Sequence, residues 1–498
     1  MTKQTRRTFL KQAAGAAAAC GVLSQTARAD VNSQIRMATI GFNSRGKSHI
    51  KGFHEHLVAL CDCDSQVLGR TAESFEKEHG RKLDKMSDFR RLLDRKDIDA
   101  VSIATPNHTH SLIAILAAQS GKDVYVEKPI SQRVWEGRQL ANASDRYKRI
   151  VQVGTQGRSS PPIQQAVEYV HSGKLGHVQY VVGTCYKPRP SIGKIDHPLA
   201  IPKQLDYELW CGPAAKVDLY RPVRNTMGGY NPHYDWHWDF NTGCGDMGNQ
   251  GIHQMDIARW FLGATALSPQ VMSFGGRFGY EDAGNTANTQ VVLHNYPEAP
   301  ILFETRGLPS SKAARKDFGT WARSMDNYRG SQVGVVVQCE HGSVLSTSNY
   351  ALAQAFGPDG ELIKSWTSRQ NAEHLHFQNF LDAVRSRKRS DLHADVVEGH
   401  LSSALCHTGN VSHQLGEPRT AKDVLASDIV AKHDRLRDSV ERMFKHLKAN
   451  EVDIDQPIVT VGAWLEMDPA SERFTNSSAA NELLRRHDRK PFVVPEVA

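Results

Sequence analysis

The chain has 498 residues, more than one domain usually contains, so we expect at least two domains. Hydrophobic residues make up 40% of the chain, which is enough for a substantial core and excludes a mainly disordered protein. The 61 Lys and Arg against 54 Asp and Glu give a net charge of +7, spread along the chain, so we expect no nucleic-acid partner.

The first 29 residues have the order of parts found in an export signal. A basic segment, Thr5-Arg6-Arg7-Thr8-Phe9-Leu10-Lys11, precedes a weakly apolar run at 13–23 and the small-x-small sequence Ala27-Arg28-Ala29. Paired arginines before Phe-Leu-Lys resemble a twin-arginine signal, and an amphipathic N-terminal helix is the alternative. We predict that 1–29 is a signal peptide and that the mature protein is periplasmic. No later segment has the roughly 20 continuous apolar residues of a membrane span.

Residues 35–126 alternate between apolar strand patterns and helical patterns. Strands are expected at 35–41, 57–61, 100–104 and 123–126, with helices between them. Such alternation predicts right-handed crossovers and a parallel sheet, whose ligands bind at the carboxyl ends of the strands. We therefore predict an α/β dinucleotide-binding domain of the Rossmann type over residues 30–155.

Two of these strand ends carry groups suited to a dinucleotide. Gly41-Phe42-Asn43-Ser44-Arg45-Gly46 stands where a Gly-x-Gly-x-x-Gly turn would bring the backbone close to a pyrophosphate, although Asn43 replaces the second glycine. Asp62 follows the second strand, where a carboxylate accepts hydrogen bonds from a ribose diol and repels a 2′-phosphate. NAD is thus the expected cofactor, and NADP is less favoured. A solvated Asp at a strand end is the alternative for Asp62.

Two further strings follow strands of the same domain. Thr105-Pro106-Asn107-His108-Thr109-His110 and Glu127-Lys128-Pro129 resemble the glucose–fructose oxidoreductase/inositol dehydrogenase (Gfo/Idh/MocA) family. The resemblance implies that Lys128 lies near the nicotinamide and the substrate hydroxyl. The expected cofactor contacts are Gly41, Asn43, Ser44, Arg45, Gly46, Asp62, Thr105, Pro106, Asn107, His110, Glu127 and Lys128.

Beyond residue 155 the pattern changes to strands in succession. Candidate strands at 178–186, 290–294, 301–306 and 333–339 predict a largely antiparallel sheet in an α+β substrate domain over 156–420. Residues 421–498 have no chemical motif and are expected to form a C-terminal extension, of which 464–497 either covers the domain or makes an oligomer contact. Members of the family commonly associate through an open sheet face, so a homo-oligomer is expected.

The segment Gly245–Asp256 carries the second candidate catalytic group. The family pattern Asp-x-Gly-x-His-x-x-Asp places His253 as the acid–base residue, followed by Asp256, while Asn249 stands where the family often has Asp. A helix from Asn249 would put positions 253, 256 and 260 on one face. The amide of Asn249 cannot take a proton, so the predicted base is His253. A core His beside Asp256 is the alternative.

Aromatic and charged residues near this segment are candidate sugar contacts. Aromatic faces pack under the C–H groups of carbohydrates, while charged and amide groups bind the hydroxyls. A core cluster is the alternative. The candidate substrate contacts are Lys128, Tyr186, Lys187, Arg189, Trp236, Trp238, Asn249, His253 and Asp256.

The sequence therefore predicts an NAD(P)-dependent oxidoreductase that acts on a secondary alcohol of a sugar, glycoside or polyol, with Lys128 and His253 managing the proton. Because free NAD is scarce outside the cytoplasm, the cofactor is expected to be held tightly. One alternative is an NAD-dependent glycosidase or lyase that forms a transient ketone without net redox change. Another is a non-catalytic sugar-binding NAD protein. Cys61-Asp62-Cys63-Asp64 has no partner Cys-x-x-Cys, and no metal is expected.

Overall fold

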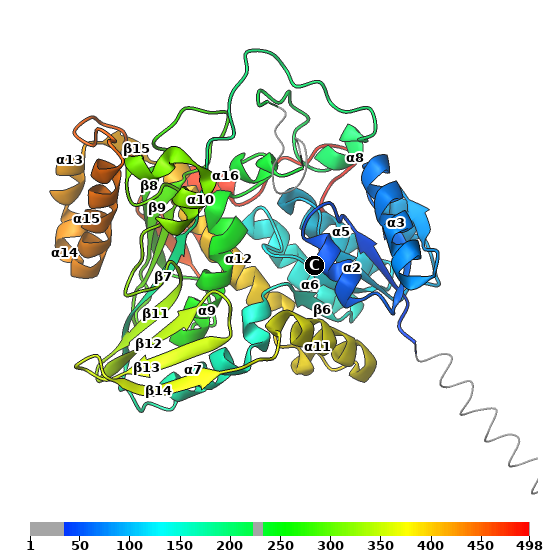
Figure 1. The fold of residues 1–498 in the computed structure, drawn as a ribbon, viewed down its shortest axis with the longest axis horizontal. Coiled ribbons are helices and arrows are strands. Elements are labelled where there is room, and N and C mark those ends of the chain that lie inside the picture. The colour runs from blue at the N-terminus through cyan, green and yellow to red at the C-terminus, as the bar shows by residue number, and fades with distance from the viewer. Residues whose placement is uncertain (1–33, 223–232, 498) are drawn as a thin grey trace, which may run out of the picture.

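A computed structural model of the chain describes residues 34–222 and 233–497, and the predicted signal peptide at 1–29 lies outside the described residues. Figure 1 shows an α/β unit, blue and cyan, beside a large curved sheet, green and yellow. None of the helices within the described residues is long and apolar enough to cross a membrane.

The N-terminal unit is built on a six-stranded parallel sheet with the order β3-β2-β1-β4-β5-β6. Its strands are β1 (Met37–Ile40), β2 (Leu57–Cys61), β3 (Asp84–Met86), β4 (Ala100–Ile103), β5 (Asp123–Val126) and β6 (Val151–Val153). Its helices are α2 (Gly46–Gly52), α3 (Ser65–His79), α4 (Phe89–Leu93), α5 (Asn107–Gln119) and α6 (Val134–Tyr147). The strand order reverses between β1 and β4, and ligands bind at such a reversal in doubly wound sheets. The predicted Rossmann architecture is confirmed.

The second unit is a larger sheet whose path runs β14-β13-β12-β11-β7-β10-β9-β8-β16-β15, with β17 paired to β8 and β18 paired to β17. Only the β7–β10 pair is parallel among the pairs described, so the predicted largely antiparallel sheet is confirmed. The strands are β7 (Val178–Tyr186), β8 (Gln270–Gly276), β9 (Thr289–His294), β10 (Ile301–Arg306), β11 (Val333–Cys339), β12 (Gly342–Thr347), β13 (Leu352–Phe356), β14 (Leu362–Thr367), β15 (Glu417–Arg419), β16 (Val459–Val461), β17 (Leu465–Asp468) and β18 (Arg473–Phe474).

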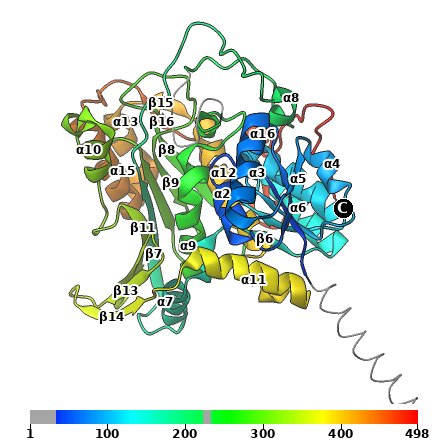
Figure 2. The same cartoon turned by 45° about the vertical axis from the view of Figure 1, so that its right-hand side comes forward.

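Helices cover the inner face of this sheet and join it to the first unit. The inner face packs against α7 (Pro161–His171), α9 (Ile252–Leu262) and α12 (Val396–Gln414). Helix α11 (Ala372–Ser386) contributes Phe377 and Phe380 to the core of the N-terminal unit, and Figure 2 shows it below β6. The two units therefore share helices along their interface.

The C-terminal residues cover parts of both units. Helices α13 (Ala421–Leu425), α14 (Asp428–Lys432) and α15 (Asp434–Ala449) pack on the outer face of β7 to β10, where Val440 and Met443 are buried against Val182 and Leu302. The sheet face expected to be open is therefore covered there by the same chain, and a homo-oligomer stays a prediction. The final segment returns to the N-terminal unit and buries Phe492, Val494 and Val497 in its core.

Candidate active site

The turn between β1 and α2 accepts only glycine at its two ends. Gly41 has a φ of +77°, and a Cβ there would lie 2.6 Å from Thr105 Cγ2. A Cβ on Gly46 would lie 2.1 Å from the carbonyl oxygen of Gly41. The turn is therefore as tight as the dinucleotide motif requires, although Asn43 stands at its second position.

A cleft with a volume of about 270 Å³ runs along the carboxyl ends of β1, β2, β4 and β5. All of the predicted cofactor residues except Gly46 line it. They are Gly41, Asn43, Ser44, Arg45, Asp62, Thr105, Pro106, Asn107, His110, Glu127 and Lys128. The cleft thus brings together residues that lie up to 87 positions apart in the sequence.

Asp62 lies in the cleft directly after β2. Its Oδ2 accepts a hydrogen bond from the Phe42 N–H (3.2 Å), and its Oδ1 accepts one from the Asp64 N–H (2.9 Å). Burial raises the pKa of Asp62 to about 6, so the carboxyl is still ionised at neutral pH. A bound ribose would meet this carboxylate, and the tight turn and Asp62 together fit NAD.

Glu127 holds Arg45 in place rather than lying free in the cleft. The buried carboxylate accepts a hydrogen bond from Arg45 Nε (2.7 Å) and lies 3.3 Å from His49 Nε2. Burial acts to raise the pKa of Glu127, but the charges of Arg45 and its neighbours bring it well below its usual range. Glu127 is thus an ionised carboxylate that fixes Arg45 at the edge of the turn.

Lys128 connects the two units across the cleft. Its Nζ donates a hydrogen bond to the backbone carbonyl of Asn249 (2.7 Å). Burial lowers the pKa of Lys128, and the nearby charges of Arg45 and Lys187 lower it further, against the opposite effect of Glu127. The ammonium group is therefore held at the end of the cleft where both units meet.

His253 lies in the first turn of α9, four positions after Asn249, and unlike Asn249 it is not among the described residues that line the cleft. Its Nδ1 is buried and has no hydrogen-bond partner among the residues described, and its ring centroid lies 6.2 Å from that of Tyr350. Burial and then the charge of Lys128 lower the pKa of His253 well below 6.5. The imidazole is therefore neutral at physiological pH and can accept a proton.

The segment before α9 differs from the regular helix that the spacing predicts. Residues Met247–Gly251 form a π-helical turn, and α9 begins at Ile252. Such turns insert an extra residue and often occur at functional sites. Asn249 lines the cleft from this turn, and its backbone carbonyl faces Lys128.

Asp256 does not face the ligand cleft, contrary to the predicted substrate role. Arg158 Nε donates to both of its oxygens (2.9 and 3.0 Å), and Ser402 Oγ donates to Oδ1 (2.7 Å). The residue is 1% exposed. Asp256 thus belongs to a buried ion pair that holds α9 against its neighbours.

Tyr186 is also placed away from the cleft. Side chains alternate along β7, and because Cys185 points to the inner face, Tyr186 points to the outer one. There its hydroxyl donates to Glu304 Oε2 (2.6 Å). The predicted substrate role of Tyr186 is therefore wrong.

Some of the other predicted substrate residues line the cleft, and the rest pack behind the residues that line it. Trp236 lines the cleft, whereas Trp238 is buried beneath Arg189, whose guanidinium carbon lies 5.2 Å from the Trp238 ring centroid. Arg189 in turn forms two hydrogen bonds with Asp246 (2.7 and 2.9 Å). Arg189 and Trp238 therefore support the site, contrary to the predicted direct contact. Lys187 donates to Gln250 Oε1 (3.0 Å), beside the π-helical turn.

The sequence prediction missed His237, which lines the cleft between the two tryptophans. Its ring stacks on Trp236 at 3.6 Å between centroids, and its Nδ1 lies 2.6 Å from the Tyr234 carbonyl. Burial lowers the pKa of His237 to about 3, so the ring is neutral. The sequence Trp236-His237-Trp238-Asp239 indicated this region, but residue spacing does not show which of its side chains faces the cleft.

Residues 204–210, which follow β7, pack beside the loop after β2. The Ser65 N–H donates to the Gln204 carbonyl (2.9 Å), and the Asp206 N–H donates to the Cys63 carbonyl (2.9 Å). Leu209 and Trp210 line the cleft beside that loop. Within the described residues no group of three or more His, Cys, Asp or Glu side chains could hold a metal ion.

The fold and the cleft define a Rossmann-type dinucleotide-binding protein with a second α/β domain. Comparison with family models agrees. Residues 35–155 match the model described as "Oxidoreductase family, NAD-binding Rossmann fold", and residues 171–300 match "Oxidoreductase family, C-terminal alpha/beta domain". These two models of one family together match half of the chain, which therefore belongs to the Gfo/Idh/MocA oxidoreductase family and carries its NAD-binding Rossmann fold.

Two curated relatives share part of the chain. A levoglucosan dehydrogenase of Pseudarthrobacter phenanthrenivorans is 36% identical over 125 residues, 25% of this chain and 31% of that protein. An alpha-N-acetylgalactosaminidase of Shewanella oneidensis is 33% identical over 123 residues, 23% of this chain and 27% of that protein. The chain thus spans less than a third of the length of either relative.

The fold is also that of a solved levoglucosan dehydrogenase in complex with NADH and levoglucosan. The likeness covers 75% of this chain and 95% of that one, with a TM-score of 0.52 and 17% sequence identity. At this identity the likeness concerns the fold alone.

Proposed function

We propose that this chain is an NAD-dependent oxidoreductase that acts on a secondary alcohol of a sugar, glycoside or polyol. The observation that carries the proposal is the contact of Lys128, at the end of the cofactor cleft, with Asn249 in the turn before α9, where the charge of Lys128 acts on His253 in the first turn of that helix. Lys128 offers hydrogen-bond donors, and the pKa of His253 is lowered by burial and by the charge of Lys128, which favours the neutral imidazole. A neutral imidazole can act as the general base that removes a proton from an alcohol.

Each residue has a distinct part in this chemistry. His253 accepts the hydroxyl proton, and Lys128 holds the hydroxyl oxygen by a hydrogen bond. NAD, when bound, supplies the nicotinamide that takes the carbinol hydride. Asp62 receives the ribose hydroxyls and disfavours a 2′-phosphate, which supports NAD over NADP. Trp236 and His237 form the wall of the cleft against which the sugar packs.

The contacts between residues 204–206 and the loop after β2 favour a second candidate reaction. We infer that these contacts of Ser65 and Cys63 slow cofactor exchange, and a retained cofactor must regain its starting redox state in each turnover. A redox-neutral glycosidase or lyase meets that condition, and one curated relative is a glycosidase. Coupled oxidation of one sugar and reduction of another meets it equally.

The protein is also proposed to act in the periplasm, exported as a folded holoprotein by the twin-arginine route. The basis is the order of the basic segment, apolar run and cleavage sequence in residues 5–29. Fusion of residues 1–29 to a reporter that is active only after such export would test it.

The deciding experiment is the release of cofactor from the purified, denatured protein, followed by absorbance and mass spectrometry. We expect one NAD(H) per chain, and turnover of sugars or glycosides without added nicotinamide. A protein that releases nothing and binds neither NAD nor NADP on titration contradicts the proposal. A protein that retains NAD and binds sugars, with no turnover, is a non-catalytic sugar-binding protein.

A further inference from the structure

Two lysine side chains reach the same turn at the end of the cleft. Lys128 Nζ donates to the carbonyl of Asn249 (2.7 Å), and Lys187 Nζ donates to Oε1 of Gln250 (3.0 Å). Asn249 and Gln250 are consecutive residues of the π-helical turn. Both acceptors are neutral, so the two ammonium groups meet at one turn without a counter-charge from it.

The arginines around the site are paired, in contrast to these lysines. Arg45 forms ion pairs with Glu127 (2.7 Å) and Glu373 (2.5 Å), and Arg189 pairs with both oxygens of Asp246. Within the described part of the chain, neither Lys128 nor Lys187 forms an ion pair with a carboxylate. The two arginines and the two lysines together face three carboxylates, which leaves one positive charge in excess at the site.

Such an excess is unfavourable unless a ligand balances it. Both lysines are half-buried, where an ammonium group loses part of its hydration. The charge of Lys187 also acts on Lys128 and on His253. A bound anion would offset these effects, because charge-assisted hydrogen bonds are stronger than neutral ones.

We propose that the substrate is an acidic sugar, with a carboxylate that binds Lys187 while a neighbouring hydroxyl lies between Lys128 and His253. The inference rests on the proposed function and narrows its substrate class. A carboxylate fits better than a phosphate, because Lys187 offers one point charge and the fork of Arg189 is occupied by Asp246. The carboxylate is unchanged in the reaction.

The test is calorimetric binding of matched sugar pairs to the full-length, cofactor-containing protein. The pairs are D-glucuronate with D-glucose and D-galacturonate with D-galactose, and glucose 6-phosphate is the phosphate probe. We expect at least one acid to bind about tenfold or more tightly than its neutral partner. Added salt should weaken binding of the acid more than binding of the neutral sugar.

Three variants identify the source of the preference. Lys187→Gln should remove it, and Lys187→Arg should retain most of it. Lys77→Gln, at an exposed position on α3, is the control and should change neither affinity. Asn249→Asp tests the same charge effect in another way. Its new carboxylate would offset the positive charge of Lys128 and should therefore lower the preference for acidic over neutral sugars.

The inference is overturned by equal or tighter binding of the neutral sugars, by binding of neither acid, by a preference for the phosphate, or by a preference that survives Lys187→Gln. The proposed function fails separately. Acid binding without any sugar turnover would contradict the oxidoreductase and support the inference. Turnover of neutral sugars with no preference for acids would support the oxidoreductase and contradict the inference.

Discussion

The Lys128 ammonium donates a 2.7 Å hydrogen bond to the backbone carbonyl of Asn249, and this contact joins the end of β5 to the turn before α9. A charged side chain of the nucleotide-binding domain is thereby held by the backbone of the second domain. The next residue beyond the turn that can take a proton is His253. The candidate active site therefore lies where this contact joins the two domains.

Replacement of either residue should separate cofactor binding from chemistry. We expect Lys128→Met and His253→Asn to retain NAD(H) but to lower kcat by about 10²–10⁴-fold, because each removes a group that handles the proton. Released cofactor and the steady-state rate are measured on the same preparation. Lys77→Met is the exposed control, and either site variant with an unchanged rate contradicts the assigned role.

The pH dependence should reflect the lowered pKa of His253. A general base acts when it is deprotonated, and its pKa lies well below 6.5 because of burial and the charge of Lys128. We therefore expect kcat/KM to stay level as the pH falls through 6.5, and to decline only in more acid solution. An acid limb centred at or above pH 6.5 would indicate a different base or an exposed imidazole.

Asp256→Asn should affect stability rather than sugar binding. Removing one charge from the buried pair with Arg158 leaves the guanidinium without its main partner, which costs about 3–5 kcal/mol of unfolding free energy. Denaturant unfolding measures the loss, and Asp382→Asn in an exposed pair on α11 is the control. If Asp256→Asn instead keeps its stability and raises only the KM for the sugar, the substrate role first predicted is correct.

The contrast between Asp256 and Lys128 shows what could be predicted from the sequence. The turn at 41–46, Asp62 and Lys128 each begin within two residues of the end of a buried strand, so their positions depend on local pattern and on parallel-sheet topology. Asp256 pairs with Arg158, which lies 98 residues earlier, and no local spacing reveals that pair.

Two other features depend on long-range packing in the same way. The π-helical turn at 247–251 differs from a regular helix only in its hydrogen bonds, so its residue pattern predicts an ordinary helix. The return of residues 484–497 to the first domain depends on a few apolar side chains, Phe492 among them, that periodicity does not distinguish from an extension.

Asp62 should determine the choice between NAD and NADP. We expect Asp62→Ser to weaken NAD binding by about tenfold or more, through loss of a charged hydrogen-bond acceptor, and to reduce the discrimination against NADP. Titration of both dinucleotides into cofactor-free protein measures the two affinities. An unchanged ratio would mean that the ribose does not meet this carboxylate.

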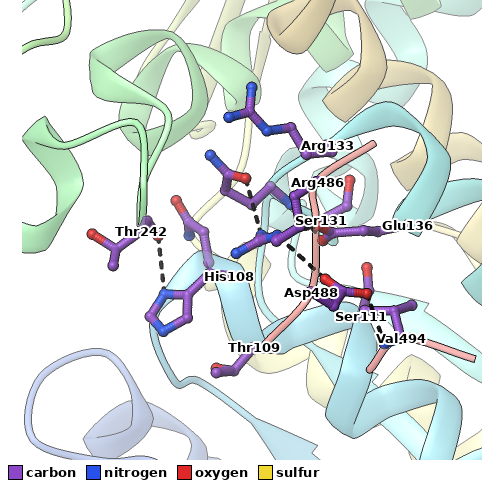
Figure 3. A network of polar contacts seen from close by, with 12 residues as sticks. His108, Thr109, Ser111, Ser131, Arg133, Glu136, Thr242, Arg486, Asp488 and Val494 are labelled. Carbon is purple, nitrogen blue, oxygen red and sulfur yellow. Dashed lines mark hydrogen bonds and ion pairs between the residues drawn. The ribbon is translucent and has the colours of Figure 1, made fainter. Parts of the chain in front are cut away.

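The last prediction concerns Arg486, which ties the C-terminal segment to the first domain. Figure 3 shows it beside Glu136 and Asp488. Its Nε donates to Glu136 Oε1 (2.9 Å) and its Nη2 donates to Gln132 Oε1 (2.9 Å), while Gln132 Nε2 donates to the Gly243 carbonyl (3.1 Å). The arginine thus supports, through Gln132, the loop that leads into the π-helical turn.

Arg486→Gln leaves the buried Glu136 carboxylate without its cation, so we expect a loss of about 3–5 kcal/mol in unfolding free energy and faster release of NAD. Arg437→Gln on α15 is the control, because the contact of Arg437 with Glu441 (2.9 Å) is exposed, and such pairs contribute about 0–1 kcal/mol. Thermal unfolding and cofactor retention during dialysis are compared between the two variants. Equal stability and equal cofactor retention would mean that the C-terminal segment covers the first domain without stabilising the cofactor cleft.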